Sequence, residues 1–264
     1  MKWVNEIWMT HSSVKSWNSS AEWDDYLRAV ESVLNDRLAK LDANDPVRRK
    51  ADTTRGEGHF ITQFGPKEDS RWILGRFEKT KVVVEIQLYK HGRDSFGERR
   101  DNTIAFYIPD KVCDRSNMEK LVELFRLTNE RHGIFYAAAD LKGVYCSKKA
   151  SPPSLGALNI ASELPGVFWL TYFGPQYCEF FGRDRLVSLE RTSEGPDGGM
   201  TLRLAETPER VPEGLRRMLE RRLGVETFAG AGEVLLEKPE GRYALTLEQL
   251  ASGPVAHSPA FRNA

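Results

Sequence analysis

The stretch RWILGRFEKTKVVVEIQLY, residues 71–89, decides the fold class. It holds two runs, Arg71–Glu78 and Val82–Tyr89, that are rich in the β-branched and aromatic residues typical of strands. Only the short segment 79–81 separates the two runs. Strands joined by so short a connection lie antiparallel, because a parallel neighbour needs a long crossover. The sequence therefore predicts an antiparallel, meander-like sheet.

Other strand-like runs surround this pair. Two precede it and four follow it: residues 2–9, His59–Phe64, Thr103–Ile108, Phe135–Asp140, Val144–Cys146 and Gly166–Phe173. Residues 192–199 contain Pro196-Asp197-Gly198-Gly199 and predict a hairpin loop between two further strands, Leu186–Arg191 and Met200–Ala205.

Three longer segments have the periodicity of amphipathic helices. The first is expected to run for about 20 residues from an N-cap at Ser19 or Ser20, because apolar residues recur at three- and four-residue steps. These residues are Trp23, Leu27, Val30, Leu34, Leu38 and Leu41. The second helix runs from a capping box at Ser116 to Gly133, the third ends at Gly224, and a short helical run lies at Leu245–Leu250. We therefore expect an α+β fold with a few amphipathic helices packed on an antiparallel sheet.

A change of composition marks one internal boundary. Residues 147–163 are dominated by Ser, Lys, Pro, Gly and Ala and include Pro152-Pro153. Such a segment is either a boundary or a functional loop. The chain, at 264 residues, is long enough for a sizeable core. We expect one α+β domain over residues 1–264, interrupted by this segment.

Charge and cysteine content narrow the function classes. Thirty-eight Lys and Arg balance 38 Asp and Glu, whereas nucleic-acid and membrane-surface binding usually leave a basic excess. We therefore expect neither a nucleic-acid nor a membrane partner. Asn5 and Glu6 interrupt any signal-peptide core. The scattered Cys113, Cys146 and Cys178 predict free thiols in a reducing compartment, so the protein is expected in the cytoplasm.

The chain carries no recognisable catalytic motif. The sequence lacks Gly-rich phosphate loops, zinc-protease motifs, nucleophile elbows and EF-hand loops. Its histidines lie far apart rather than in a ligand cluster: His11, His59, His91, His132 and His257. We therefore assign no catalytic, cofactor-binding or metal-binding residue and expect no cofactor. The pattern favours binding of another macromolecule over enzymatic activity.

One fragment leaves an enzymatic alternative open. Glu85 and Gln87 lie two residues apart on the apolar run 82–89. Restriction-endonuclease-like enzymes carry a similar strand, with Glu-x-Lys, that holds a metal ion over a phosphate. Gln87 stands where that lysine would be, and strand alternation explains both residues without a metal. A metal-dependent nuclease that uses Glu85 is therefore one alternative, and a structural or scaffold protein is another.

The most aromatic stretch of the chain is a second candidate for function. Seven of the 14 residues from Phe168 to Phe181 are aromatic. A strand here would carry bulky residues on both faces, so it is either a core strand or partly an interface, for which Tyr and Trp are well suited. The candidate partner-binding residues of this stretch are Trp169, Tyr172, Phe173, Tyr177 and Glu179.

One motif covers this stretch. It consists of Leu164-Pro165-Gly166-Val167-Phe168-Trp169, then Tyr172-Phe173-Gly174-Pro175, then a Tyr-x-x-Phe-x-Gly continuation. It resembles a motif of bacterial polymorphic-toxin immunity proteins, nearest to the immunity protein 52 family. Residues 75–79, 102–109 and 135–140 support this resemblance.

The resemblance implies a non-enzymatic cytosolic antidote. Such a protein binds and neutralises the toxin of a neighbouring gene, typically a nuclease delivered by contact-dependent or type VI secretion. Because a nuclease usually presents a basic groove to its substrate, an acidic antidote surface would speed association. Asp24, Asp25 and Glu31 on the first predicted helix are candidates for that surface, although they also suit a solvated helix face. The charged loop 90–102 and segment 147–163 are further candidates.

Overall fold

The structure, a computed structural model, describes residues 6–52, 56–65, 68–94, 96, 98–148, 164–189, 191–212, 214–224, 227–228 and 244–252. The fold is α+β, as expected: these residues hold nine strands, and every strand pair with a defined register is antiparallel. The chain divides into two compact units, Met1–Ala137 and Ala138–Ala264. The single domain expected over residues 1–264, with segment 147–163 as a boundary or functional loop, stays a prediction. Residues 149–163 lie outside the described residues.

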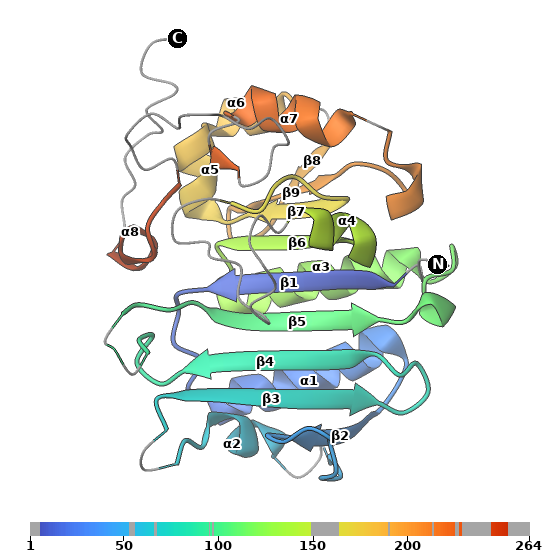
Figure 1. Cartoon of the computed structure of the whole chain (residues 1–264), viewed down its shortest axis with the longest axis vertical. Helices are drawn as coiled ribbons and strands as arrows, with labels where there is room; N and C mark the ends of the chain where they lie inside the picture. Colours follow the sequence, from blue (N-terminus) through green and yellow to red (C-terminus); the bar gives the residue numbers. More distant parts are fainter. Residues whose placement is uncertain are drawn as a thin grey trace. The chain divides into compact units, whose positions relative to one another are not determined.

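The first unit contains the predicted meander. Its strands are β1 (Ile7–Ser13), β2 (Leu38–Asp42), β3 (Ser70–Phe77), β4 (Val83–Tyr89) and β5 (Asn102–Ile108). They lie in the order β2-β3-β4-β5-β1 (Figure 1). The register of β3 and β4 runs from Ser70 opposite Tyr89 to Arg76 opposite Val83, so the stretch that decided the fold class forms the hairpin it predicts.

Helices cover one face of this sheet. The helical elements of this unit are α1 (Ser20–Leu34), α2 (Glu57–Thr62), the 3₁₀ turn η1 (Asp110–Val112) and α3 (Met118–His132), of which α1 and α3 lie on that face. Figure 1 draws α1 and α3 on the same side of the strands, and the two helices pack against each other. The buried residues of α1 are Trp23, Tyr26, Leu27, Val30 and Leu34, as the periodicity requires. The Ser19 hydroxyl accepts a hydrogen bond from Glu22 N at 3.3 Å, which confirms the predicted N-cap.

The first helix is shorter than expected, because Leu38 and Leu41 belong to β2. Asn35 adopts the left-handed conformation (φ 48°, ψ 44°), which ends α1. The β2–β3 register shifts between Leu38 and Lys40. This bulge places both Leu38 and Leu41 on the buried side of the strand. Buried residues three positions apart, a spacing typical of a helix, therefore occur here in a strand.

Three further predicted strands are wrong. Residues His59–Thr62 of the run His59–Phe64 lie in α2, which begins after Gly56 in a left-handed conformation and includes the buried Ile61. Val144–Cys146 lies in α4 (Lys142–Ser147). Of the run Leu186–Arg191, Leu186 and Val187 end α6 (Arg183–Val187), and the first hairpin strand begins only at Thr192. All three segments are short, and tertiary packing overrides the weak strand propensity of such runs.

The second unit holds a smaller antiparallel group. β6 (Tyr136–Leu141) crosses the division between the units, and β7 (Leu170–Phe173), β9 (Met200–Arg203) and β8 (Thr192–Glu194) follow in the spatial order β7-β9-β8. The other elements are α5 (Pro175–Phe181), the 3₁₀ turn η2 (Pro208–Arg210), α7 (Leu215–Leu223) and α8 (Leu247–Ser252). In the part of the chain that the structure describes, no helix is long and apolar enough to cross a bilayer.

Candidate partner-binding surfaces

The aromatic stretch of the second unit is a core. Trp169, Phe173 and Tyr177 are 0% exposed and Tyr172 is 2% exposed. All four residues of β7 are buried, so both of its faces are covered. These four aromatic side chains therefore belong to the core in this structure, and burial leaves them little surface with which to contact a partner. Glu179, on the outer side of α5, is exposed and stays a candidate.

Charged side chains hold this aromatic strand in place from α7. The Arg216 guanidinium donates to both carboxylate oxygens of Asp140, at 2.8–3.1 Å. Trp169 N also donates to Asp140, at 2.9 Å. One turn further along α7, Glu220 accepts from Val167 N at 2.8 Å and forms an ion pair with Lys148.

This charged network was not found from the sequence. Arg216 and Glu220 lie four residues apart on α7, on the same side as the buried Leu219 and Leu223. Charged residues in phase with apolar ones are the signal that could have identified it, because such residues are buried only when paired.

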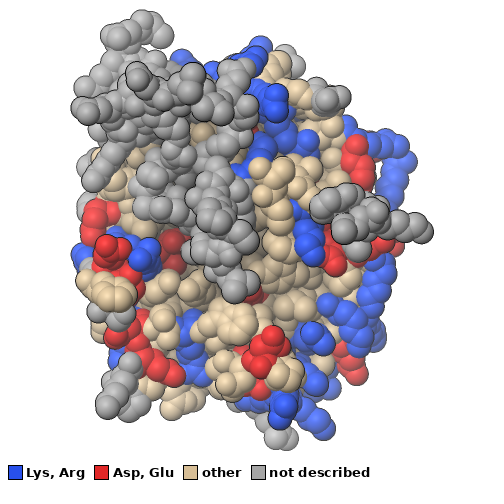
Figure 2. All heavy atoms as spheres, viewed as in Figure 1, with Lys and Arg blue, Asp and Glu red and all other residues tan. Residues whose placement is uncertain are grey.

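The opposite side of α7 forms a basic surface. Arg217, Met218, Arg221 and Arg222 are exposed there, with 43% of Met218 accessible. Together with Gly214 they line a shallow depression. Figure 2 shows Lys and Arg gathered near the α7 end of the visible face. Arg and Met are enriched at protein interfaces, so this surface is a candidate for partner contact.

The acidic residues predicted on the first helix have mostly internal partners. Asp24 accepts from Gly58 N at 2.6 Å and so fastens α2 to α1. Glu31 accepts from Leu38 N at 2.7 Å and fastens β2. Asp25 is exposed and forms an ion pair with Arg28 on the same helix. The structure thus gives Asp24 and Glu31 structural partners and leaves Asp25 as the exposed acidic candidate of the set.

The charged loop 90–102 presents an apolar tip. Phe96 is 89% exposed. Asp94 organises the loop by accepting from Phe96 N and Glu98 N at 2.9–3.0 Å and from Arg100 Nε at 2.8 Å. Burial opposes ionisation of Asp94, but these hydrogen bonds, with the Arg100 charge, lower its pKa below the ordinary value.

Glu85 lies on the half-exposed face of β4 with Val83 and Gln87, as strand alternation predicts. Its carboxylate accepts a hydrogen bond from the Tyr107 hydroxyl at 2.8 Å. Among the residues that the structure describes, no group of three or more His, Cys, Asp and Glu side chains could hold a metal ion. The three cysteines are free thiols, and burial raises the pKa of Cys178 to about 12.

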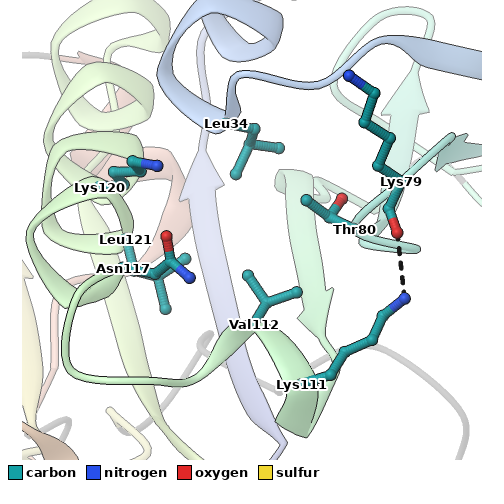
Figure 3. A pocket seen from close by; sticks show the side chains of 8 residues that line it. All are labelled: Leu34, Lys79, Thr80, Lys111, Val112, Asn117, Lys120 and Leu121. Atoms are coloured by element: carbon teal, nitrogen blue, oxygen red, sulfur yellow. Dashed lines mark hydrogen bonds between the residues drawn. The ribbon is translucent and has the colours of Figure 1, made fainter.

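A pocket in the first unit combines an apolar floor with a basic rim. It encloses about 250 Å³. We call it the lysine pocket and define it by its lining residues, Leu34, Lys79, Thr80, Lys111, Val112, Asn117, Lys120 and Leu121. The floor residues Leu34, Val112 and Leu121 are buried, whereas the three lysines are exposed. Figure 3 shows these side chains arriving from the end of α1, the β3–β4 turn, η1 and the start of α3.

Asp36 shapes the rim of the lysine pocket from below. Its buried carboxylate accepts from Lys79 N at 3.0 Å and from Thr80 N at 2.7 Å and Thr80 Oγ1 at 2.6 Å. Burial opposes ionisation of Asp36, but the hydrogen bonds from Thr80, Lys79 and Arg37 hold its pKa below the ordinary value. The Lys111 ammonium group donates to the Lys79 carbonyl oxygen at 3.1 Å, which Figure 3 marks.

A polar cluster is buried elsewhere in the first unit. The His132 ring lies 4.3 Å from the Tyr26 ring and 4.9 Å from the Trp23 ring, and His11 Nδ1 lies 2.9 Å from Asn129 Oδ1. Within the described residues, neither Nε2 of His11 nor Nε2 of His132 has a hydrogen-bond partner. Burial lowers the pKa of His11 to about 4 and that of His132 to about 3. Both rings are therefore neutral at pH 7.

Comparison with known proteins places the fold but not the family. No family model matches the chain, and no curated protein matches it. Among solved structures, the chain is similar to the Pseudomonas aeruginosa T6SS protein PA0821, with a TM-score of 0.59 and 13% sequence identity. The similarity covers 93% of this chain and 81% of that one. At this identity the likeness shows a shared α+β fold.

Proposed function

We propose that this chain is a type VI secretion immunity protein that binds and neutralises a cognate toxin domain. The observation that carries the proposal is the fold shared with a T6SS protein over 93% of the chain. The motif around residues 164–182, which resembles the immunity protein 52 family, supports it independently. Membership of that family is part of the proposal.

In this proposal the protein is not an enzyme, and inhibition comes from covering the toxin. The buried aromatic strand and its charged network supply rigidity, because a surface that is already ordered loses less entropy on binding. Contact with the toxin is then made by exposed residues outside that core. The described candidates are the lysine pocket, the outer side of α7, Phe96 at the loop tip, Glu179 and Asp25.

We place this activity in the cytoplasm and propose a nuclease domain as the toxin. An antidote against a toxin that cleaves cytoplasmic nucleic acid has to meet it in the same compartment. Such an antidote must bind very tightly, with a dissociation constant in the low nanomolar range or below, which corresponds to about 12 kcal/mol of binding free energy.

Co-expression tests the proposal. The chain is produced together with the C-terminal domain encoded by the gene immediately upstream, and cell survival and co-elution are measured. We expect death without the chain, survival with it, and one complex on size exclusion. A harmless upstream product, or two proteins that elute separately, would refute the proposal.

The Glu85→Ala variant separates this function from the nuclease alternative. If the chain protects by binding, the variant should protect as well as the wild-type protein, since Glu85 contacts Tyr107 within the sheet. Metal-dependent cleavage of DNA or RNA by the purified chain, abolished by Glu85→Ala, would instead support the enzyme.

A further inference from the structure

We propose that the lysine pocket receives an acidic side chain of the cognate toxin. Lys111 and Lys120 would then be part of the toxin-binding surface. This inference rests on the immunity function proposed above and adds to it the place and the charge of the contact.

The size of the pocket fits one side chain. Its volume of about 250 Å³ lies below the range of about 300–1,000 Å³ that is usual for small-molecule sites. The floor formed by Leu34, Val112 and Leu121 is apolar. A glutamate or aspartate can lay its methylene groups on this floor while its carboxylate reaches the lysines at the rim.

The charge around the pocket selects an anion. Lys79, Lys111 and Lys120 come from three separate elements and surround the same opening (Figure 3). None of the lining residues is acidic. Asn117 is the N-cap and Lys120 lies in the first turn of the 15-residue helix α3, whose N-terminal end adds a partial positive charge that Glu119 in the same turn offsets in part. The apolar floor favours a protein carboxylate over a nucleic-acid phosphate, because a phosphate has no apolar part to place there.

The rim is ordered before any partner arrives. Asp36 fixes the backbone of Lys79 and Thr80 through their N–H groups, and Lys111 is held by the Lys79 carbonyl oxygen. Little backbone ordering therefore remains to oppose binding. This organisation distinguishes the lysine pocket from lysines scattered over the surface.

A pair of matched charge reversals tests the inference. The pocket variant is Lys111→Glu/Lys120→Glu, and the control is Lys40→Glu/Lys50→Glu, on exposed lysines of the same unit. Both variants change the net charge equally, so long-range attraction to the toxin is altered alike. We expect the pocket variant to bind the toxin domain at least about 100-fold more weakly and the control to stay within about threefold, as for loss of a close charge pair. Circular dichroism and thermal unfolding verify that both variants fold.

Cross-linking locates the contact directly. A water-soluble carbodiimide joins an ammonium group to a carboxylate only when the two touch. In the wild-type complex we expect mass spectrometry to find Lys111 or Lys120 joined to an Asp or Glu of the toxin.

The outcomes separate the two proposals. In one outcome the wild-type chain protects cells, the pocket variant binds the toxin as tightly as the wild type, and no cross-link involves the rim lysines. The pocket inference then fails, and the immunity function stands. If the wild-type chain neither binds nor protects, the immunity function fails and the pocket inference falls with it. Loss of binding to a labelled DNA duplex in the pocket variant, with toxin binding intact, would make the pocket a nucleic-acid site and overturn the inference.

Discussion

Arg216 on α7 and Asp140 at the end of β6 form a bidentate ion pair in which the carboxylate is fully buried. The same carboxylate accepts the Trp169 N–H, so one residue links α7 to the start of the aromatic strand. A buried charge that loses its partner is strongly destabilising, even though the intact pair adds little net stability.

The first prediction follows from this pair. Arg216→Met leaves Asp140 buried without its cation and should lower the free energy of unfolding of the second unit by about 3–5 kcal/mol. Urea denaturation measures this loss, with Arg217→Met, on the exposed side of the same helix, as the control. Asp140→Asn/Arg216→Met should recover part of the loss, because the asparagine oxygen still accepts from Trp169 N. A double variant as unstable as the single one would contradict this account.

The second prediction concerns the aromatic core. Phe173 is fully buried, with its ring 5.1 Å from that of Phe181. Phe173→Ala should therefore cost about 3–5 kcal/mol of stability. Glu179→Ala, at an exposed position of the neighbouring helix, should change stability by less than about 0.5 kcal/mol. A mild effect at Phe173 in denaturation experiments would mean that this strand is not the core of its unit.

The third prediction concerns the contact between α1 and α2. A Cβ atom on Gly58 would lie 1.9 Å from the Ser20 carbonyl oxygen, and the backbone there cannot move aside as a flexible side chain could. Gly58→Ala must therefore separate the helices and break the bond from Gly58 N to Asp24. We expect a loss of about 3 kcal/mol or more, measured by thermal unfolding. His59→Ala, exposed on the same helix, is the control and should be nearly neutral.

The fourth prediction is a loss of stability in acid. Because burial lowers the pKa of His11 to about 4 and of His132 to about 3, the unfolded chain binds these protons first. Stability is therefore fully present above pH 6.5 and falls as the pH drops from 6.5 toward 4. His132→Phe keeps a ring of similar shape in the aromatic cluster and should remove on the order of 3 kcal/mol of this pH dependence.

Urea titrations of wild-type and His132→Phe at several pH values measure that difference. Asp101 has the opposite effect on stability as the pH falls. Burial raises its pKa to about 6, so the folded chain binds a proton at Asp101 more tightly than the unfolded chain does. It is present in both proteins and cancels in the comparison. If the free energy of unfolding depends on pH equally in the two proteins between pH 6.5 and 4, His132 is not buried in its neutral form.

The sequence predicted the elements whose pattern has a single physical explanation. The hairpin of residues 71–89, the Ser19 cap and the end of α3 at Gly133 all formed as expected. It did not predict β2, because a bulge gives Leu38 and Leu41 a spacing that also suits a helix. Local periodicity cannot distinguish these cases, since only the partner strand reveals the bulge.

The surface was harder to predict than the core. Aromatic residues such as Trp169 are as compatible with a core as with an interface, and only their burial decides between the two. Lysines such as Lys79 and Lys120 are distant in sequence, and the pocket they share depends on how a turn and a helix meet. No pattern along the chain carries that information.

Around Asp36, the residues that hold the fold and the lysines at the rim of the pocket differ in how freely they can be substituted. The Asp36 carboxylate and the apolar floor contribute to folding, because the carboxylate holds the β3–β4 turn and the floor residues are buried. The lysine ammonium groups above them are exposed and contribute little to stability. A lineage of such proteins can therefore invert or dilute the charge at this opening through a few substitutions, without rebuilding the scaffold. If the lysine pocket contacts the toxin as proposed, the specificity of that contact can change while the fold stays the same.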